Sequence, residues 1–241
     1  MKKALCVVAA RRGSKGLESK CMQPIGGKPV VEHVIAWAAD LGRKKAGIET
    51  IVTSDISELE MISQRYSVAW RSRPAQLADD TAHIEDVMMD ALECCSDRFE
   101  FLALLYGNVP VRHNRLFLDP LRYLENHSQA DAVLTFQEVE KFHPDWMVMR
   151  ATERLPTWKK GAHRRQDLTP YMIHDGHTIL LRMSHFIEFW PQRHRLSRNQ
   201  MYEAYGFEIK PWLHEEIVID IDTRRDYLLA KAYMEDQIKG A

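Results

Sequence analysis

A loop of glycines, serines and cations follows the first apolar run of the chain. From residue 11 to residue 28 it carries five cations and one acidic residue, so its local charge is +4 in a chain of net charge −1. Glycine lets backbone N–H groups approach a ligand closely, and cations near the start of a helix stabilise a bound anion. A solvated surface loop is the alternative, but the position directly after a predicted strand favours a phosphate site.

This cationic loop lacks the two best-known phosphate-binding patterns. No G-K-[ST] closes it as in a Walker P-loop, and it does not contain the G-x-G-x-x-G fingerprint of dinucleotide-binding domains. P-loop hydrolysis and dinucleotide binding are therefore disfavoured.

Two carboxylates near the C-terminus could bind a metal ion. Asp220 and Asp222 lie in an apolar run, residues 217–222, that we expect to form a strand. Residues two apart on a strand point the same way, and two carboxylates with substrate phosphates are a usual site for Mg²⁺. Alternatively, Asp222 or Thr223 only caps the next helix. The cationic loop favours the metal site.

Three further segments place cations in loops. Arg71 and Arg73 could reach a base or a phosphate, and Arg112 ends a sharp loop after a predicted buried strand. Arg164 and Arg165 could grip a carboxylate through paired guanidinium groups, or they could belong to a solvated charged run.

Alternating strand and helix patterns would position these residues. We expect strands at 4–9, 49–53, 68–70, 99–105, 132–135, 177–181 and 217–222, and helices at 29–41, 57–66, 84–95, 116–126 and from 223 onward. This alternation predicts a mostly parallel sheet with helices on both faces, and ligands bind beyond the carboxyl ends of such strands. Between 138 and 176 the periodicity weakens, which indicates an insertion.

The bulk composition limits the class of protein. The 241 residues are 45% hydrophobic, which suits one large domain with a core. The net charge of −1 gives no support to nucleic-acid binding, and no apolar run is long enough for a transmembrane helix. The first apolar run breaks at two arginines, so we interpret it as a strand rather than a signal peptide. Four cysteines without a C-x-x-C pattern predict free thiols and a cytoplasmic location.

Taken together, these segments resemble the acylneuraminate (CMP-sialic acid) cytidylyltransferases. The similar stretches are Ala10–Gly16 with Lys20 (A-R-x-x-S-K-G-x-x-x-K), Thr53–Asp55 (S-T-D), Arg73–Thr81 (R-P-x-x-L-A-x-D-T), Leu105–Arg112 (L-Q-P-T-S-P-L-R), Arg164–Gln166 with Asp175-Gly176 (R-R-Q and N-G) and Asp220–Thr223 (D-I-D-T). They occur in the same order and span nearly the whole chain. Six such matches in order are highly specific.

The resemblance implies a fold, a reaction and an assembly. The fold would be a Rossmann-like nucleotidyltransferase of the nucleotide-diphospho-sugar transferase type, one α/β domain over 1–241 with a dimerisation insertion at 138–176. The reaction would be a Mg²⁺-dependent transfer of CMP from CTP to the anomeric hydroxyl of a sialic-type acid, with release of pyrophosphate. The partners would be CTP, the sugar acid and a second copy of the chain, without nucleic acid or membrane.

The resemblance also implies a role for each matching residue. The catalytic residues would be Arg11, Lys20 and Asp222. The nucleotide would contact Ala10, Arg11, Gly13, Ser14, Lys15, Gly16, Lys20, Cys21 and Arg73. The sugar would contact Tyr106, Asn108, Arg112, Arg165, Gln166 and Asp175, and the metal Asp220 and Asp222.

Three departures from the family pattern leave the sugar open. Cys21 stands where the family has Asn, residues 106–109 replace Q-P-T-S, and His177-Thr178 replaces a small apolar pair. Sialic, legionaminic and pseudaminic acids and ketodeoxyoctonate (KDO) are all consistent with this. Two other hypotheses are a non-catalytic nucleotide-sugar-binding module and a glycosyltransferase with an Asp-x-Asp metal site. The C-terminal position of the acid pair disfavours the glycosyltransferase.

Overall fold

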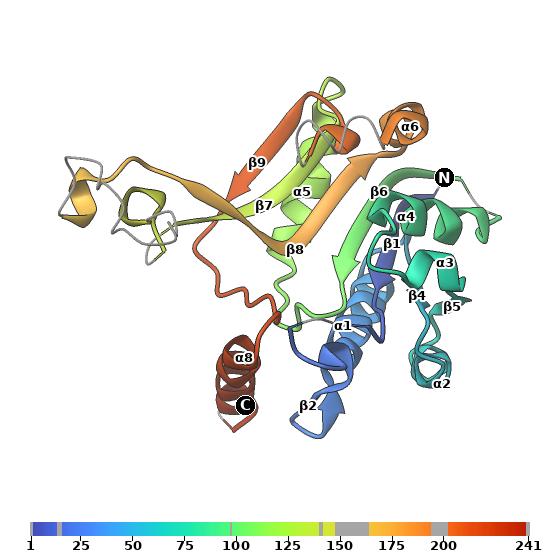
Figure 1. Cartoon of the computed structure of the whole chain (residues 1–241). Helices are drawn as coiled ribbons and strands as arrows, with labels where there is room; N and C mark the ends of the chain where they lie inside the picture. The colour runs from blue at the N-terminus through green and yellow to red at the C-terminus, as the bar shows by residue number, and fades with distance from the viewer. Residues whose placement is uncertain are drawn as a thin grey trace.

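The fold is built on one seven-stranded sheet (Figure 1). This computed structural model describes residues 2–13, 16–96, 98–139, 142–147, 164–193 and 202–239. The strands lie in the order β5-β4-β1-β6-β8-β7-β9. Their bounds are β1 (Lys2–Ala9), β4 (Ile48–Ser54), β5 (Ala69–Ser72), β6 (Phe99–Tyr106), β7 (Ala132–Glu138), β8 (Met172–Arg182) and β9 (Ile209–Leu213). A small antiparallel pair holds β2 (Pro24–Ile25) and β3 (Lys28–Pro29).

All strands of the large sheet except β8 run in the same direction. β1 is parallel to β4 and β6, β4 to β5, and β7 to β9, whereas β8 is antiparallel to both β6 and β7. The carboxyl ends of the parallel strands therefore lie at one edge, together with the start of β8. We call this the site edge, because ligands bind there in open α/β sheets.

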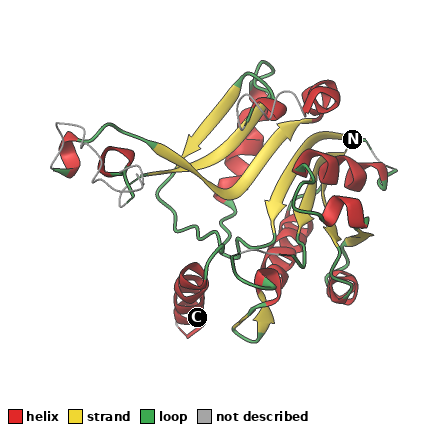
Figure 2. Ribbon diagram, viewed as in Figure 1, coloured by secondary structure: helices red, strands yellow, loops and turns green. Residues whose placement is uncertain are grey.

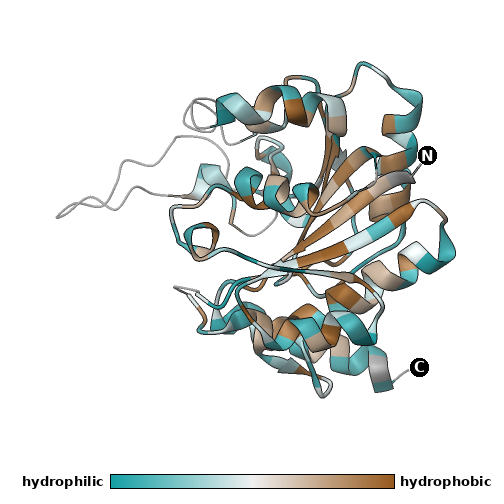
Figure 3. Cartoon of the chain, turned by 90° about the vertical axis from the view of Figure 1, so that its right-hand side faces the viewer, coloured by the Kyte–Doolittle hydropathy of each residue, from teal (hydrophilic) through white to brown (hydrophobic). Residues whose placement is uncertain are grey.

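Helices cover both faces of the sheet, which explains the continuous apolar run of β1. Cys6 and Val8 face a core that includes side chains of α1, α2 and α5, and Leu5 and Val7 face a second core with α4 and α6. The helices are α1 (Val30–Lys44), α2 (Glu58–Arg65), α3 (Ala75–Ala78), α4 (Ile84–Glu93), α5 (Arg115–Asn126), α6 (Met183–Phe189) and α8 (Arg224–Lys239). Figure 3 shows the hydrophobic strands between helices above and below them.

The sequence prediction of a mostly parallel α/β sheet is confirmed, but its last strand is wrong. Residues 217–222 form no strand. The last strand of the sheet is instead β9, which pairs with β7 at the end of the strand order. Ile219 and Ile221 do alternate toward a small core with Tyr227 of α8, which imitates a strand pattern. The backbone N–H of Ile221 donates to the carbonyl of Asn108 at 3.0 Å, so this segment is tied to a loop rather than to the sheet.

The predicted insertion begins inside the sheet. Glu138 pairs with Met172, so β7 and β8 continue as a two-stranded ribbon beyond the other strands (Figure 2). We call this ribbon, with residues 142–147 and 164–171, the arm. It carries the short helices η2 (Pro144–Trp146) and η3 (Arg165–Asp167). Within the described ranges, no helix combines the length and apolarity needed to span a membrane.

Candidate active site

Main-chain contacts bring three loops together at the site edge. The N–H of Ala10, after β1, donates to the carbonyl of Thr53 at 3.2 Å, and the N–H of Gly107, after β6, donates to the carbonyl of Ala9 at 2.9 Å. A Cβ on Gly107 would lie 3.0 Å from both Ala9 O and Ala10 Cβ, so this close approach favours glycine. The base of the cationic loop is thus fixed against both neighbouring strands.

The cationic loop and the acid pair are in direct contact, although they are about two hundred residues apart in the chain. Lys20 Nζ donates to Asp222 Oδ1 at 2.6 Å. A Cβ on Gly16 would lie 2.3 Å from the backbone oxygen of Asp222, so glycine is required there. The two features that suggested phosphate and metal binding therefore form one site.

The carboxylate of Asp220 is held from the other side. Asn108 Nδ2 donates to Asp220 Oδ1 at 2.5 Å and to Ile221 O at 3.1 Å. Burial, and then the negative charge of Asp222, raise the pKa of Asp220 from 3.8 to about 6. Asn108, which we expected to contact the sugar, therefore contacts the acid pair.

The chemistry of this pair fits a magnesium ion. Two neighbouring carboxylates repel each other, which raises the pKa of one of them, and a bound cation relieves this repulsion. Mg²⁺ commonly binds one or two carboxylates together with substrate phosphates. Among the described residues, no three His, Cys, Asp or Glu side chains are grouped to hold a metal without a substrate. Asp220 and Asp222 are the residues that would hold the ion.

The predicted nucleotide side contains one half-buried arginine, Arg11, and one buried arginine, Arg73. Arg11 Nη2 pairs with Asp80 at 2.7 Å. Arg73 is buried, and its Nη2 donates to the carbonyl of Thr53 at 2.8 Å. Burial lowers the pKa of Arg73 to about 10, so the guanidinium stays charged at neutral pH. Its charge interacts with Arg11 and Cys21 of the cationic loop.

Cys21 is buried between charged groups of the site. Lys20, Arg73 and Asp220 all act on its thiol electrostatically, but burial is the largest effect and raises the pKa of Cys21 to about 11. The thiol is therefore protonated at neutral pH. A thiol is a weak hydrogen-bond donor, so Cys21 does not reproduce the contacts of the amide that the resemblance leads one to expect.

At the predicted sugar side of the site, the structure brings Tyr106 and Gly176 close to Asp220 of the acid pair. A Cβ on Gly176, whose φ is +74°, would lie 3.4 Å from Asp220 Oδ2 and 3.6 Å from the Tyr106 ring. The hydroxyl of Tyr106 bonds to Tyr205, and burial raises the pKa of Tyr106. These residues form one wall beside Asp220.

Two residues that we expected to contact the sugar, Arg112 and Asp175, instead point their side chains toward the protein interior. The guanidinium of Arg112 donates to the carbonyls of Tyr106 and His177, and burial lowers the pKa of Arg112 to about 9. The carboxylate of Asp175 is buried and accepts three hydrogen bonds, among them one from His214. Both side chains hold the site together rather than facing an open pocket. No sequence pattern indicated His214.

The remaining predicted residues are either exposed or outside the described part of the chain. Gln166 is exposed in η3, far out on the arm and away from the site of its own chain (Figure 1). Gly13 is exposed in the cationic loop. Ser14, Lys15 and the side chain of Arg165 lie outside the described residues.

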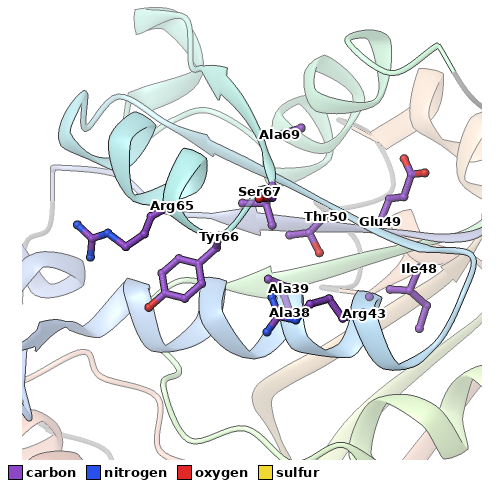
Figure 4. Close-up of a pocket in the computed structure, with 12 residues that line it drawn as sticks. Ala38, Ala39, Arg43, Ile48, Glu49, Thr50, Arg65, Tyr66, Ser67 and Ala69 are labelled. Carbon is purple, nitrogen blue, oxygen red and sulfur yellow. The ribbon is translucent and has the colours of Figure 1, made fainter.

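A cavity of about 430 Å³ lies at the edge of the sheet opposite the site edge (Figure 4). It is lined by the starts of β4 and β5 and by the C-terminal parts of α1 and α2. Arg43 and Arg65 at its rim pair with Asp40 and Glu32. None of its lining residues belongs to the cationic loop or the acid pair, so we assign it no part in the reaction.

Comparison with known proteins gives the family. The family model described as cytidylyltransferase matches residues 5–236. An N-acylneuraminate cytidylyltransferase from Streptococcus agalactiae serotype V is 29% identical over 231 residues, which cover 94% of this chain and 52% of that protein. This chain thus spans about half the length of that curated relative.

Two other similar proteins match over nearly their full length. A pseudaminic acid cytidylyltransferase from Campylobacter jejuni is 24% identical and is covered to 95%, as is this chain. The solved structure of a CMP:2-keto-3-deoxy-manno-octonic acid synthetase complexed with CTP has a TM-score of 0.69 and 19% identity, with 98% of this chain and 99% of that chain covered. This likeness confirms the Rossmann-like nucleotidyltransferase fold. The chain belongs to the cytidylyltransferase family, a family of nucleotidyltransferases.

Proposed function

We propose that this protein transfers CMP from CTP to the anomeric hydroxyl of a nonulosonic acid and releases pyrophosphate. The contact between Lys20 and Asp222, which joins a cationic loop to a carboxylate pair at the site edge, is the observation that carries this proposal. The names of two similar proteins support the substrate class, because they refer to N-acylneuraminate and to pseudaminic acid. The name of the similar solved structure refers to a related eight-carbon acid, 2-keto-3-deoxy-manno-octonic acid.

The nucleotide would lie over the half of the sheet formed by β5, β4, β1 and β6. Arg11 and Lys20 would bind the triphosphate, and the glycines of the cationic loop would let backbone N–H groups approach it. The charge of Arg73 would add to the positive potential. We keep Ala10 and Arg73 as the residues for the cytidine end.

The sugar acid would lie over β8, β7 and β9, on the other side of the acid pair. Its anomeric oxygen would form a bond to the α-phosphorus while the bond to the pyrophosphate oxygen breaks, and the hydroxyl proton leaves to solvent. Such a transfer needs positioning and charge neutralisation more than covalent help from the protein. Tyr106 and Gly176 would limit where the acid can lie.

The acid pair would bind Mg²⁺. When bound, this ion would neutralise phosphate charge and polarise the attacking hydroxyl. Lys20 would orient Asp222, and Asn108 would orient Asp220. These two contacts keep the carboxylates in place before the substrates arrive.

The arm would pair two copies of the chain. Phe142, Met147, Met172 and Ile173 are between 47% and 61% exposed, and the arm carries an apolar cavity of about 410 Å³. A second copy would cover this surface and could bring Arg165 and Gln166 to the first copy's sugar site. Light scattering on the purified protein should give twice the chain mass, and a change of Ile173 and Met172 to Asp should give the single-chain mass.

A pyrophosphate-release screen tests the proposed reaction. The protein is incubated with CTP, Mg²⁺ and one sugar acid at a time: N-acetylneuraminic, legionaminic or pseudaminic acid, or KDO. We expect release with one nonulosonic acid and with CTP in preference to the other nucleoside triphosphates. Release with KDO alone would move the substrate to the octulosonic acids. Tight CTP binding without release from any acid would favour the non-catalytic module.

A further inference from the structure

A buried histidine–carboxylate pair lies behind the acceptor side of the site. His214 Nε2 contacts Asp175 Oδ2 at 2.5 Å, and the two side chains are only 4% and 3% exposed. The other carboxylate oxygen of Asp175 accepts from the hydroxyl of Thr135 at 2.6 Å and from the N–H of His177 at 2.9 Å. A buried charge is costly unless it is hydrogen-bonded, and here both oxygens are satisfied.

The hydrogen bonds fix the direction of the pair. The N–H of Glu216 donates to His214 Nδ1 at 3.1 Å, so this nitrogen carries no proton. The proton is therefore on Nε2 and points at Asp175. Burial alone would raise the pKa of Asp175, but the donors around it lower the pKa below its usual value. Asp175 is thus an acceptor only, and each of its partners is a donor.

The pair lies at an irregularity between two strands. The register of β7 and β8 shifts between Leu134 and Phe136, so Thr135 has no regular partner in β8, although it pairs with Trp212 of β9. The hydroxyl of Thr135 donates to Asp175 and accepts from the N–H of Thr178 at 3.1 Å. Bulges of this kind often lie next to active sites, where they redirect a side chain. The network fills the gap that the shift leaves.

Two routes connect this network to the acid pair. Gly176 follows Asp175 directly and lies against Asp220, as the 3.4 Å separation of its added Cβ from Asp220 Oδ2 shows. His214 begins the segment 214–222 that ends with the acid pair. Near the end of this segment, Asn108 holds Asp220. The segment is therefore anchored at one end by Asp175 and at the other by Asn108.

We propose that His214 and Asp175 form a positioning pair that fixes the carboxylate of Asp220 and the Gly176 wall without touching a substrate. The inference rests on the proposed function, because it assigns a role within the same site. It predicts that weakening the pair lowers metal affinity and acceptor turnover, while CTP binding without metal stays unchanged. Partners that orient a metal-binding carboxylate commonly change affinity or activity by about 10–100-fold when they are lost.

The hydrogen-bond polarity gives a sharp variant. In D175N the side-chain amide lies between the N–H of His177 on one side and the Nε2–H of His214 on the other. In either orientation, its NH₂ group therefore faces one of these two N–H donors. We expect D175N to weaken Mn²⁺ binding in the presence of CTP, followed by electron paramagnetic resonance, by about tenfold or more. The kcat/KM for the sugar acid should fall by a similar factor. CTP affinity measured by calorimetry without metal should change less than about twofold.

A substitution at His214, H214Q, complements D175N, because it allows this position to accept a hydrogen bond as well as to donate one. Gln in place of His214 can present either N–H or oxygen to its partner. H214Q should therefore stay close to the unchanged protein, and the double variant D175N/H214Q should recover part of the Mn²⁺ affinity that D175N loses. Such recovery would show that the two side chains act through their mutual contact.

A second histidine–aspartate contact supplies a matched control. His185 contacts Asp131, a buried residue that accepts from the N–H groups of Phe207 and Glu208, at the edge of the sheet opposite the site edge. D131N also puts an amide among donors, so it should lower the melting temperature. It should leave the Mn²⁺ affinity of the CTP complex unchanged.

The results separate this inference from the proposed function. Retention of Mn²⁺ affinity within about twofold in folded D175N would overturn the positioning role. If D175N does not fold, a tenfold loss in H214A with retention in H214Q supports the role, and equal behaviour of these two variants overturns it. Silence of the unchanged protein with every sugar acid would contradict the proposed function, and the Mn²⁺ comparison would still decide the positioning role.

Discussion

The two halves of the sheet hold their loops in different ways. In the half formed by β5, β4, β1 and β6, which we call the nucleotide half, main-chain bonds join the loops: Ala10 to Thr53, Gly107 to Ala9, and Arg73 to Ser54. In the half formed by β8, β7 and β9, which we call the acceptor half, the main chain of His214 also bonds to Phe136, but buried and charged side chains supply further contacts between the loops. There His214 bonds to Asp175, Gln137 to the carbonyl of Glu216, and Arg115 to the Glu216 carboxylate.

This difference has a consequence for specificity. Main-chain bonds survive most substitutions, so a loop held by them keeps its shape while its side chains vary. A loop held by side chains changes shape when one partner changes. Under the proposed function, the nucleotide half would suit a constant substrate, CTP, and the acceptor half would suit a sugar acid that differs between relatives. The acid pair lies between the two halves. Lys20 and Asn108, which follow β1 and β6 of the nucleotide half, hold Asp222 and Asp220, and Gly176 of the acceptor half lies against Asp220.

The largest effect is expected where the two halves meet. D222A removes a carboxylate that would bind the metal and leaves Lys20 without its partner. Loss of one group aimed at transition-state charge costs about 10²–10³-fold in rate, so pyrophosphate release should fall by at least this factor. D236N on the exposed face of α8 is a matched acid change and should leave the rate unchanged. Full activity of D222A would remove Asp222 from the mechanism.

The main-chain packing of the nucleotide half can be tested at Gly107. The added methyl of G107A would lie 3.0 Å from Ala9 O and from Ala10 Cβ, neither of which can swing away. Overpacking of this kind costs about 1–3 kcal/mol of unfolding free energy, measured by urea denaturation. G13A is the control for stability, because a Cβ on Gly13 meets nothing within 4 Å. Equal stability of both variants would show that the loops are not packed as described.

The coupling of the two carboxylates can be tested through pH. Because the pKa of Asp220 is raised to about 6, the folded protein without metal retains a proton that the unfolded chain releases from about pH 4 upward. Asp220 thus contributes less to stability as the pH rises through this window. Mg²⁺ with CTP should offset the loss, so the rise in melting temperature that they cause should be larger above pH 7 than near pH 5. A smaller rise above pH 7 would contradict the raised pKa.

The smallest effect concerns the thiols. Cys21 is buried and its pKa is raised to about 11, whereas Cys94 is exposed. An aromatic disulfide reagent should therefore label Cys94 first and Cys21 much more slowly, as followed by peptide mass spectrometry. Comparable labelling rates would mean that the nucleotide half opens readily.

The same contrast explains what the sequence could predict. Strands buried on both faces, such as β1 and β6, are continuous apolar runs and are visible as such. The cationic loop and the acid pair were also visible, because glycines and cations stand together at 11–28 and Asp-x-Asp stands at 220–222. β9 was not, since Lys210 and Pro211 interrupt its apolar pattern, and residues 217–222 imitate a strand while packing against α8.

Side-chain networks were beyond prediction. Asp175 and His214 are 39 residues apart with no periodic relation, and only the fold brings them together. Arg112 and Asn108 were expected at the sugar because the family resemblance implies that their loop faces it. Their hydrogen bonds instead hold a loop and a carboxylate, and position at an edge does not reveal which way a side chain turns.

The transfer of CMP is tested most directly by phosphorus NMR. The protein, CTP and Mg²⁺ are incubated with the sugar acid that releases most pyrophosphate, and the α-phosphorus is followed through the reaction. The account predicts that it becomes a sugar phosphodiester as one equivalent of pyrophosphate appears. Its conversion to free CMP, or its persistence in CTP while the sugar acid is bound, would contradict the account.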